Sequence, residues 1–315
     1  MTTHRRVLVT GAAGFIGSHM CRRLVADGHD VVGLDDLSEG SLANLADTPE
    51  VNLIEADLRD EQAVRDAARG CAAIYHQGAK RSVARSMDEP GLIADVNVRG
   101  TLNVLLAARD QHASVVSASS SSVYGDQTTF PLTEDMTPQP RSPYAAAKLA
   151  AEVFVGGLHR SYGLRAVSLR YFNVYGPGMD PTSQYALVVP LFVTACLTGT
   201  RPVIQGDGEQ SRDFTYIDDV VEANLLAARA PDTAQGLAYN IGGGAIPTSV
   251  NQLLAMIAER CGAQPDPIWD PPRPGDVRTT HADVSLATRL LGYVPKVGID
   301  EGVTKTVASF EEKVA

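Results

Sequence analysis

The sequence is poor in cysteine, in positive charge and in long apolar runs, and these shortages argue against several classes of protein. Its four cysteines (Cys21, Cys71, Cys196 and Cys261) are widely scattered and form no C-x-x-C pair. This spacing argues against a disulfide framework and against a cysteine-bound metal, so we expect reduced packing residues and no metal site.

Positive charge is scarce as well. The chain has 27 Lys and Arg against 37 Asp and Glu, a net charge of −10. Such an acidic balance argues against nucleic acid or an anionic membrane as the main partner. An acidic protein that binds an anionic substrate must therefore concentrate its arginines locally.

Long apolar runs are also missing. No stretch approaches the roughly 18 apolar residues that a membrane span needs, and the start, Met1 to Arg6, runs into a strand without a signal-peptide core. We therefore expect a cytoplasmic protein. With 315 residues, of which 44% are hydrophobic, the chain can form one large domain and a smaller one.

The first informative motif is a glycine turn between a strand and a helix. An apolar run at residues 7–9 leads into T-G-A-A-G-F-I-G, and helical spacing continues to Asp27. Glycines there permit a tight turn and close approach of a pyrophosphate, which the N–H groups of the helix start can bind. We predict five cofactor-binding residues here: Gly11, Gly14, Phe15, Ile16 and Gly17. The alternative is an ordinary glycine turn, since the spacing is one residue longer than G-x-G-x-x-G.

A carboxylate follows at the end of the second expected strand, residues 29–34. Asp35 lies 24 residues after Gly11, near the position of the carboxylate that binds the adenosine ribose of a dinucleotide. Because this charge would repel a 2′-phosphate, the sequence favours NAD over NADP. A NADPH-dependent sugar reductase is the alternative that Asp35 opposes.

Strands and helices alternate over the first half of the chain. Further strands are expected at residues 51–55, 73–76, 114–118 and 166–172, with helices at 61–69, 95–109 and from 142 onward. This order predicts an α/β, Rossmann-type doubly wound parallel sheet with right-handed crossovers.

The alternation fails after residue 172. Helices are expected near residues 187–197, 218–230, 249–260, 283–291 and 301–313, with a strand at 237–241 and a Pro-rich loop at 265–274. We therefore predict a NAD-binding domain of residues 1–172 plus about 214–241. The rest, about 173–213 plus 242–315, would form a smaller α/β substrate-binding domain.

A tyrosine and a lysine share one face of the helix that begins after Ser142. Ser142 suits a helix cap and the following proline suits the first helical position. Tyr144 and Lys148 are four residues apart, and a nearby ammonium favours the phenolate over the phenol, whose pKa is ordinarily about 10. The pair could therefore remove a hydroxyl proton, although this spacing is common enough by chance to need support elsewhere.

Support comes from a serine run, S-S-S-S-V-Y-G, at the end of the fifth expected strand. Ligands of open parallel sheets bind outside the carboxyl ends of the strands. These hydroxyls are therefore placed to meet a substrate. A flexible linker is the alternative, but linkers rarely interrupt a βαβ series just before a helix.

Taken together, these motifs resemble the extended short-chain dehydrogenase/reductase superfamily over about residues 5–300, in its branch of NAD-dependent nucleotide-sugar epimerases and dehydratases. The chain is most similar there to the UDP-glucose and UDP-N-acetylglucosamine 4-epimerases. The resemblance implies Ser120, Tyr144 and Lys148 as catalytic residues. It also implies that NAD is bound by Asp57 and Leu58 beside the adenine, by Asn97 behind the cofactor, and by Tyr144 and Lys148. The implied substrate-binding residues are Ser120, Asn173, Arg212, Arg273, Asp276 and Thr280.

The implied reaction is inversion at C4 of a UDP-hexose through a transient 4-keto sugar. Tyr144 would take the C4 hydroxyl proton as the hydride passes to NAD, and the arginines would hold the diphosphate. No metal is implied. A homodimer is implied, built from helices at residues 95–109 and 142–162.

Departures from the branch narrow the choice of reaction. Ser121 and Ser122 stand where dehydratases have an Asp-Glu pair, and decarboxylases tend to have Glu in place of Ser122. Asp180 stands where uronate 4-epimerases need an arginine, and Thr280 falls at a position that is small in enzymes for N-acetyl sugars. UDP-glucuronate 4-epimerases, dehydratases and decarboxylases remain the alternatives, together with a non-catalytic NAD-sensing protein. The sequence leaves the hexose open.

Overall fold

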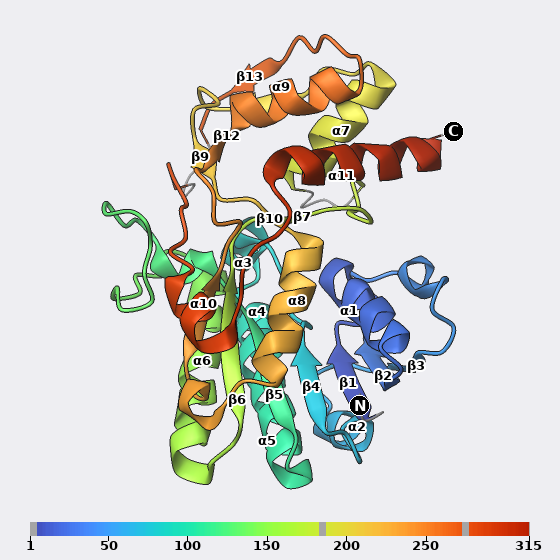
Figure 1. Cartoon of the computed structure of the whole chain (residues 1–315), viewed down its shortest axis with the longest axis vertical. Helices are drawn as coiled ribbons and strands as arrows, with labels where there is room; N and C mark the ends of the chain where they lie inside the picture. Colours follow the sequence, from blue (N-terminus) through green and yellow to red (C-terminus); the bar gives the residue numbers. More distant parts are fainter. Residues whose placement is uncertain (1–4, 183–186, 273–276, 315) are drawn as a thin grey trace.

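A seven-stranded sheet forms the lower half of the molecule (Figure 1). The computed structural model describes residues 5–182, 187–272 and 277–314. Every neighbouring pair of strands in this sheet is parallel. From one edge to the other the strands are β11 (Ala238–Ile241), β6 (Ala166–Tyr171), β5 (Ser114–Ser120), β4 (Ala73–His76), β1 (Arg6–Thr10), β2 (Asp30–Asp35) and β3 (Asn52–Glu55). The prediction of a Rossmann-type doubly wound sheet is confirmed.

Helices cover both faces of the sheet because its strands are apolar on both sides. Leu8 and Val9 of β1 are both fully buried, yet they belong to different core clusters on opposite faces. The face of Val9 is covered by α1 (Phe15–Ala26) and α8 (Ile217–Ala228). The face of Leu8 is covered by α2 (Glu61–Ala67), α5 (Thr101–Gln111) and α6 (Pro143–Tyr162).

The helix expected at residues 95–109 begins earlier and is interrupted. After the short α3 (Val83–Asp88), Pro90 occupies a first-turn position of α4 (Pro90–Ala94), and a π-helical turn (Asp95–Gly100) then leads into α5. A side chain at Gly100 would come within 2.8 Å of Leu58. The π-helical turn before α5 therefore packs closely on the segment after β3. The spacing of apolar residues in the sequence did not reveal this contact.

The upper half lies over the carboxyl ends of the strands (Figure 1). It contains helices α7 (Val188–Thr198), α9 (Val250–Arg260) and α11 (Ile299–Val314), and short strand pairs. The pairs are β7 (Val174–Tyr175) with β10 (Thr215–Tyr216), β8 (Val203–Gln205) with β13 (Ile268–Asp270), and β9 (Ser211–Arg212) with β12 (Thr248–Ser249). The prediction of a loop throughout residues 265–274 was wrong, because β13 forms by hydrogen bonding to β8, 65 residues away in the chain. By contrast, α10 (Ser285–Leu291) returns to the sheet and packs beside its edge strand β11.

Candidate active site

One large cavity lies between the carboxyl ends of the sheet and the upper half. Its volume is about 1490 Å³, whereas a pocket for one drug-sized ligand has roughly 300–1,000 Å³. The cavity therefore has room for a dinucleotide and a second nucleotide together. Most of the predicted site residues line it: Gly11, Gly14, Phe15, Ile16, Gly17, Asp35, Asp57, Leu58, Ser120, Tyr144, Lys148, Asn173, Arg212 and Thr280. Arg273 and Asp276 lie outside the described residues.

The glycine turn leaves no space for side chains. Gly11 has a φ of 67°, in the left-handed region, and a Cβ at Gly17 would lie 1.9 Å from the carbonyl oxygen of Gly11. The turn is thus closed tightly against the start of α1, and Gly14, the N-cap of this helix, presents backbone rather than a side chain to the cavity. A helix start exposed in this way suits the pyrophosphate of a dinucleotide, so the residues present fit NAD.

Asp35 is fixed to this turn by its carboxylate. One oxygen accepts a hydrogen bond from the Ala13 N–H at 3.0 Å, and the other accepts one from the Leu37 N–H at 2.8 Å. Burial raises the pKa of Asp35, and these two hydrogen bonds oppose the rise. The carboxylate therefore has a fixed orientation at the wall of the cavity.

Lys80 adds a cation to this end of the cavity that we did not predict. Its ammonium lies 3.1 Å from an Asp36 carboxylate oxygen and bonds to the Ser38 hydroxyl. Asn97 holds the Lys80 backbone with two hydrogen bonds of 2.8 Å, one to the N–H and one from its own amide to the carbonyl. Asn97 itself does not line the cavity but supports a segment that does. The π-helical turn that carries Asn97 is a feature often found at functional sites.

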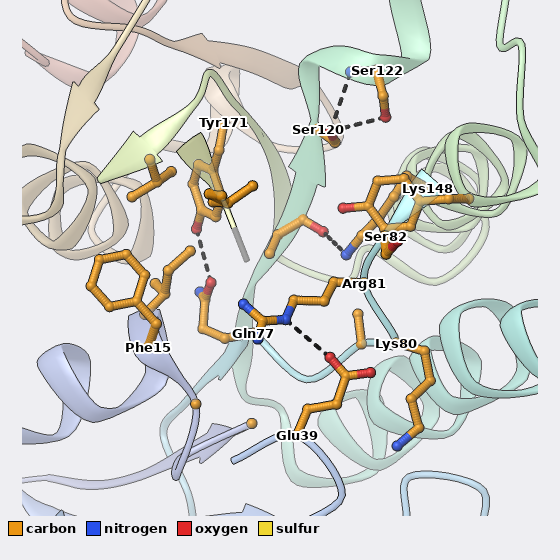
Figure 2. A pocket seen from close by; sticks show the side chains of 18 of the residues that line it. Phe15, Glu39, Gln77, Lys80, Arg81, Ser82, Ser120, Ser122, Lys148 and Tyr171 are labelled. Carbon is orange, nitrogen blue, oxygen red and sulfur yellow. Dashed lines mark hydrogen bonds and ion pairs between the residues drawn. The ribbon is translucent and has the colours of Figure 1, made fainter. Parts of the chain in front are cut away.

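A second unpredicted contact joins the segment after β2 to the segment after β4. Glu39 accepts hydrogen bonds from Arg81 at 3.1 Å and from Arg85 at 2.8 Å. Figure 2 shows the Arg81–Glu39 pair beside Gln77 in the pocket. The sequence signals were a Lys-Arg pair shortly after β4 and acidic residues after β2, two strands that β1 separates in the sheet.

Tyr144 and Lys148 project from the first turns of α6, as their spacing predicted. The Ser142 hydroxyl caps the helix by accepting a hydrogen bond from the Ala145 N–H at 3.2 Å. The Lys148 ammonium donates to the Ala118 carbonyl of β5 at 2.8 Å and lies 6.0 Å from the centre of the Tyr144 ring. Burial lowers the pKa of Lys148 to about 8, so part of its positive charge is lost at mildly basic pH.

The pKa of Tyr144 differs from the prediction. Burial raises it, while a hydrogen bond from Ser120 and the charge of Arg81 oppose the rise. Our expectation that Lys148 would favour the phenolate was therefore wrong for the protein alone, because removal of the phenol from water outweighs the nearby charges. Positive charge added to the cavity would oppose this rise in the pKa of Tyr144.

The serine run supplies a directed chain of hydroxyls. The Ser122 hydroxyl donates to the Ser120 oxygen at 2.9 Å, and the Ser122 N–H donates to the same oxygen at 3.2 Å (Figure 2). Since Ser120 accepts both bonds, its own proton is available for the bond to Tyr144. Ser122 stands at the position where the dehydratases of this branch have a carboxyl group. In this protein its hydroxyl orients Ser120 instead.

At the opposite end of the cavity, Asn173 and Thr280 hold each other. The Asn173 amide donates to the Thr280 hydroxyl at 2.9 Å and to the Asp213 carbonyl at 3.0 Å. Asn173 has a φ of 35°, a left-handed conformation that asparagine adopts more readily than most residues. Arg212 lines the same end and donates to the Ser211 carbonyl at 2.9 Å.

The described ranges contain neither a candidate metal site nor a candidate membrane span. Residues 5–182, 187–272 and 277–314 contain no group of three or more His, Cys, Asp or Glu side chains placed to hold a metal. Within the same ranges, no helix has both the length and the apolar character needed to cross a bilayer.

Comparisons with known proteins agree with this geometry. Residues 7–242 match the NAD-dependent epimerase/dehydratase family. The chain is 42% identical over 314 residues to the UDP-glucose 4-epimerase of Mycolicibacterium smegmatis, covering 98% of this chain and 99% of that protein.

Two solved structures have nearly the same fold. The UDP-glucose 4-epimerase of Thermotoga maritima, solved with UDP-glucose, has a TM-score of 0.93 at 37% identity, with 98% of this chain and 100% of that chain covered. The UDP-N-acetylglucosamine 4-epimerase of Methanobrevibacter ruminantium, in complex with UDP-N-acetylmuramic acid, has a TM-score of 0.93 at 35% identity, with 99% of each chain covered. The chain therefore belongs to the NAD-dependent epimerase/dehydratase family.

Proposed function

We propose that this protein interconverts the C4 epimers of a UDP-hexose, namely UDP-glucose and UDP-galactose, with the N-acetylated pair as second substrates. The observation that carries the proposal is the hydroxyl chain from Ser122 through Ser120 to Tyr144, which lies beside Lys148 in a cavity with room for two nucleotides. The 4-epimerase relatives support the choice of substrate.

NAD has a complete set of proposed contacts in the described residues. Gly11, Gly14 and Gly17 would hold its pyrophosphate, Asp35 its adenosine ribose, and Lys148 its nicotinamide ribose. Phe15, Ile16, Asp57 and Leu58 would complete the contacts, with Asn97 supporting them from behind. When bound there, NAD would supply a reversible acceptor for the hydride on C4 of the sugar.

In the proposed mechanism, Tyr144 removes the proton from the C4 hydroxyl of the sugar. Ser120 donates a hydrogen bond to Tyr144 and to the sugar oxygen, and Ser122 keeps Ser120 in the required orientation. Burial raises the pKa of Tyr144, so the positive charges of Lys148 and of a bound oxidised cofactor would both favour the phenolate that acts as the base. The resulting 4-keto sugar must then turn over before the proton and hydride return on its other face.

This turnover requires a firm grip on UDP and a loose grip on the sugar. We assign the UDP contacts to Arg212, Asn173 and Arg273, with Asp276 at the uridine ribose. Arg212 and Asn173 line the described end of the cavity, and guanidinium groups suit a diphosphate. The part of the cavity proposed for the sugar is lined instead by the small hydroxyls of Ser120, Ser121 and Ser122.

Two features favour epimerisation over the related reactions. Neither Ser121 nor Ser122 can replace the carboxyl group that water elimination needs for proton transfer. Asp180 lines the cavity and would repel the carboxylate of a UDP-uronate. These side chains therefore disfavour the dehydratase, decarboxylase and uronate epimerase alternatives.

A substrate panel tests the proposed function directly. Purified protein without added NAD is incubated with UDP-glucose, UDP-N-acetylglucosamine and UDP-glucuronate, and the products are identified by NMR. We expect UDP-galactose from UDP-glucose, with UDP-N-acetylgalactosamine from the N-acetyl substrate and no conversion of the uronate. Loss of water or of carbon dioxide from any substrate would contradict the proposal.

We further propose two domains, a NAD-binding domain of residues 1–172 plus about 214–241 and a substrate domain formed by the rest. The position of α7, α9 and α11 over the strand ends supports this division (Figure 1).

A cytoplasmic location is proposed because four free cysteines suit a reducing compartment. Cell fractionation would check the location.

We also propose a homodimer formed through the outer surfaces of α5 and α6. Val153 and Tyr162 of α6 are 64% and 62% exposed, and the Arg109 guanidinium of α5 lies 5.3 Å from the centre of the Tyr162 ring. Large apolar side chains exposed together often mark an interface.

In sedimentation equilibrium we expect twice the chain mass of 33.4 kDa, and a monomer for Val153→Glu. The matched control is Val294→Glu, at an exposed valine outside both helices, which should stay dimeric. A monomeric wild-type protein would contradict the proposal.

A further inference from the structure

Glu152 carries a buried negative charge that the proposed mechanism does not use. It lies on α6 one turn beyond Lys148, so that Tyr144, Lys148 and Glu152 follow one another at intervals of four residues along one face. The Glu152 side chain is 7% exposed. Since a buried carboxylate is costly unless it is paired and hydrogen-bonded, its surroundings require an explanation.

Two strands hold the Glu152 carboxylate in place. Arg170 of β6 binds both oxygens, through Nε at 2.9 Å and Nη2 at 2.8 Å, and the Ser119 hydroxyl of β5 donates to the first oxygen. Arg170 is itself anchored by a 2.8 Å bond to the Tyr124 hydroxyl. The carboxylate therefore cannot move away from its position beside the catalytic helix face.

The same short stretch of β5 serves the catalytic residues. Ala118 accepts the hydrogen bond of Lys148, Ser119 binds Glu152, and Ser120 follows directly. The Glu152 carboxylate thus belongs to the same packed unit as Lys148, although the hydrogen bonds of Glu152 go to β5 and β6.

The charged and titratable groups around Lys148 come from three elements. His76 of β4 is neutral, because burial lowers its pKa to about 3, and the Lys148 charge lowers it further in the same direction. Arg170 of β6 is a cation, and Tyr144 of α6 is a phenol unless the reaction ionises it. Burial lowers the pKa of Lys148, and the negative charge of Glu152 raises it.

We propose that Glu152 is a positioning residue that keeps Lys148 protonated during turnover, acting through space from a carboxylate locked by Arg170 and Ser119. The inference rests on the proposed role of Lys148 as an ammonium. It explains why an acidic residue follows Tyr144 and Lys148 on the same helix face. Without Glu152, the cations of Lys148 and Arg170 would share a buried site with no anion to balance them.

The test is the pH dependence of kcat in wild type, Glu152→Gln and Glu152→Asp. Wild-type kcat should fall at basic pH as Lys148 loses its proton. In Glu152→Gln this descending limb should move to lower pH by about one unit. At a fixed pH on the basic side of both limbs, kcat of the variant would then be about tenfold lower than that of wild type. Glu152→Asp keeps the charge and should restore the wild-type limb.

Two further variants separate this role from a structural one. Ser119→Ala removes a hydrogen bond to the carboxylate but not its charge, so it should leave the limb in place even if the melting temperature falls. A purely structural Glu152 would lower the melting temperature of Glu152→Gln without moving the limb. An active Glu152→Gln with an unmoved limb overturns the inference.

Glu152→Gln leaves Arg170 buried without its partner and could fail to fold for that reason. In that event the double variant Glu152→Gln/Arg170→Gln removes both charges of the pair. The Lys148 ammonium is then titrated directly by NMR of ε-¹³C-labelled lysine, with Lys148→Met to assign its signal. Because Arg170 is itself a cation, the reference for the double variant is Arg170→Gln, which keeps the Glu152 carboxylate. We expect Lys148 to titrate at lower pH in the double variant than in Arg170→Gln, and equal titrations overturn the inference.

The titration also distinguishes the two proposals. A wild-type protein that epimerises no UDP-hexose would refute the proposed function. The NMR titration would still report whether Glu152 holds the proton on Lys148.

Discussion

Replacing Tyr144 by phenylalanine is expected to lower kcat for UDP-galactose by about 10²- to 10⁴-fold, the usual contribution of a positioned acid or base. The hydroxyl is the only group removed, and Ser120 would then have no phenolic oxygen to receive its hydrogen bond. The ring stays, so NAD content and melting temperature should change little. The measurement is kcat at saturating substrate, together with the NAD content of the purified protein.

A matched control lies on the same helix. Tyr162 of α6 is 62% exposed, and Tyr162→Phe should keep wild-type turnover. Unaffected turnover in Tyr144→Phe would contradict the catalytic assignment and would revive a non-catalytic, NAD-sensing role. A loss of kcat together with lost NAD would point to a damaged cofactor site rather than to a missing base.

Replacing Gly17 by alanine is expected to abolish tight NAD binding, with an affinity loss of about 10²-fold or more, and to destabilise the fold. The added Cβ would lie 1.9 Å from the Gly11 carbonyl oxygen, a backbone atom that cannot move without opening the turn. Overpacking of this kind costs about 1–3 kcal/mol or more. Isothermal titration with NAD and urea unfolding would measure the two effects separately.

Gly91→Ala provides the control for Gly17→Ala. Gly91 also lies in a helix, α4, and an added Cβ there meets nothing within 4 Å. Alanine should leave NAD binding unchanged and slightly raise stability, since alanine favours a helix more than glycine does. Wild-type NAD affinity in Gly17→Ala would show that the turn tolerates a side chain and would contradict the assignment of Gly17.

Several parts of the site could be predicted because they depend on residues close together in the chain. The glycine turn, the Ser142 cap and the Tyr144–Lys148 face are each set within one turn of backbone, where steric limits and helix period apply directly. Asp35 was predictable for a related reason. Its place at the end of the second strand follows from the βαβ order, and the structure ties it to the glycine turn through the Ala13 N–H.

Other parts depend on contacts between distant segments, for which the sequence holds no periodic signal. The pairing of β13 with β8 arises from hydrogen bonds across the upper half of the molecule. The Lys80–Asp36 and Arg81–Glu39 pairs require the segments after β2 and β4 to meet at the cavity. Sequence alone could not show which of many acidic residues these cations would reach.

The sequence by itself determined the family, the cofactor and the tyrosine–lysine pair that we propose for catalysis, because each depends on a local motif whose geometry the backbone enforces. Only the tertiary structure decided the charges under which those residues work. Burial raises the pKa of Tyr144 and lowers that of Lys148, and the degree of burial is a property of the packed fold. Glu152, which the sequence left unremarked, became a candidate for proton control only when β5 and β6 fixed its carboxylate beside Lys148.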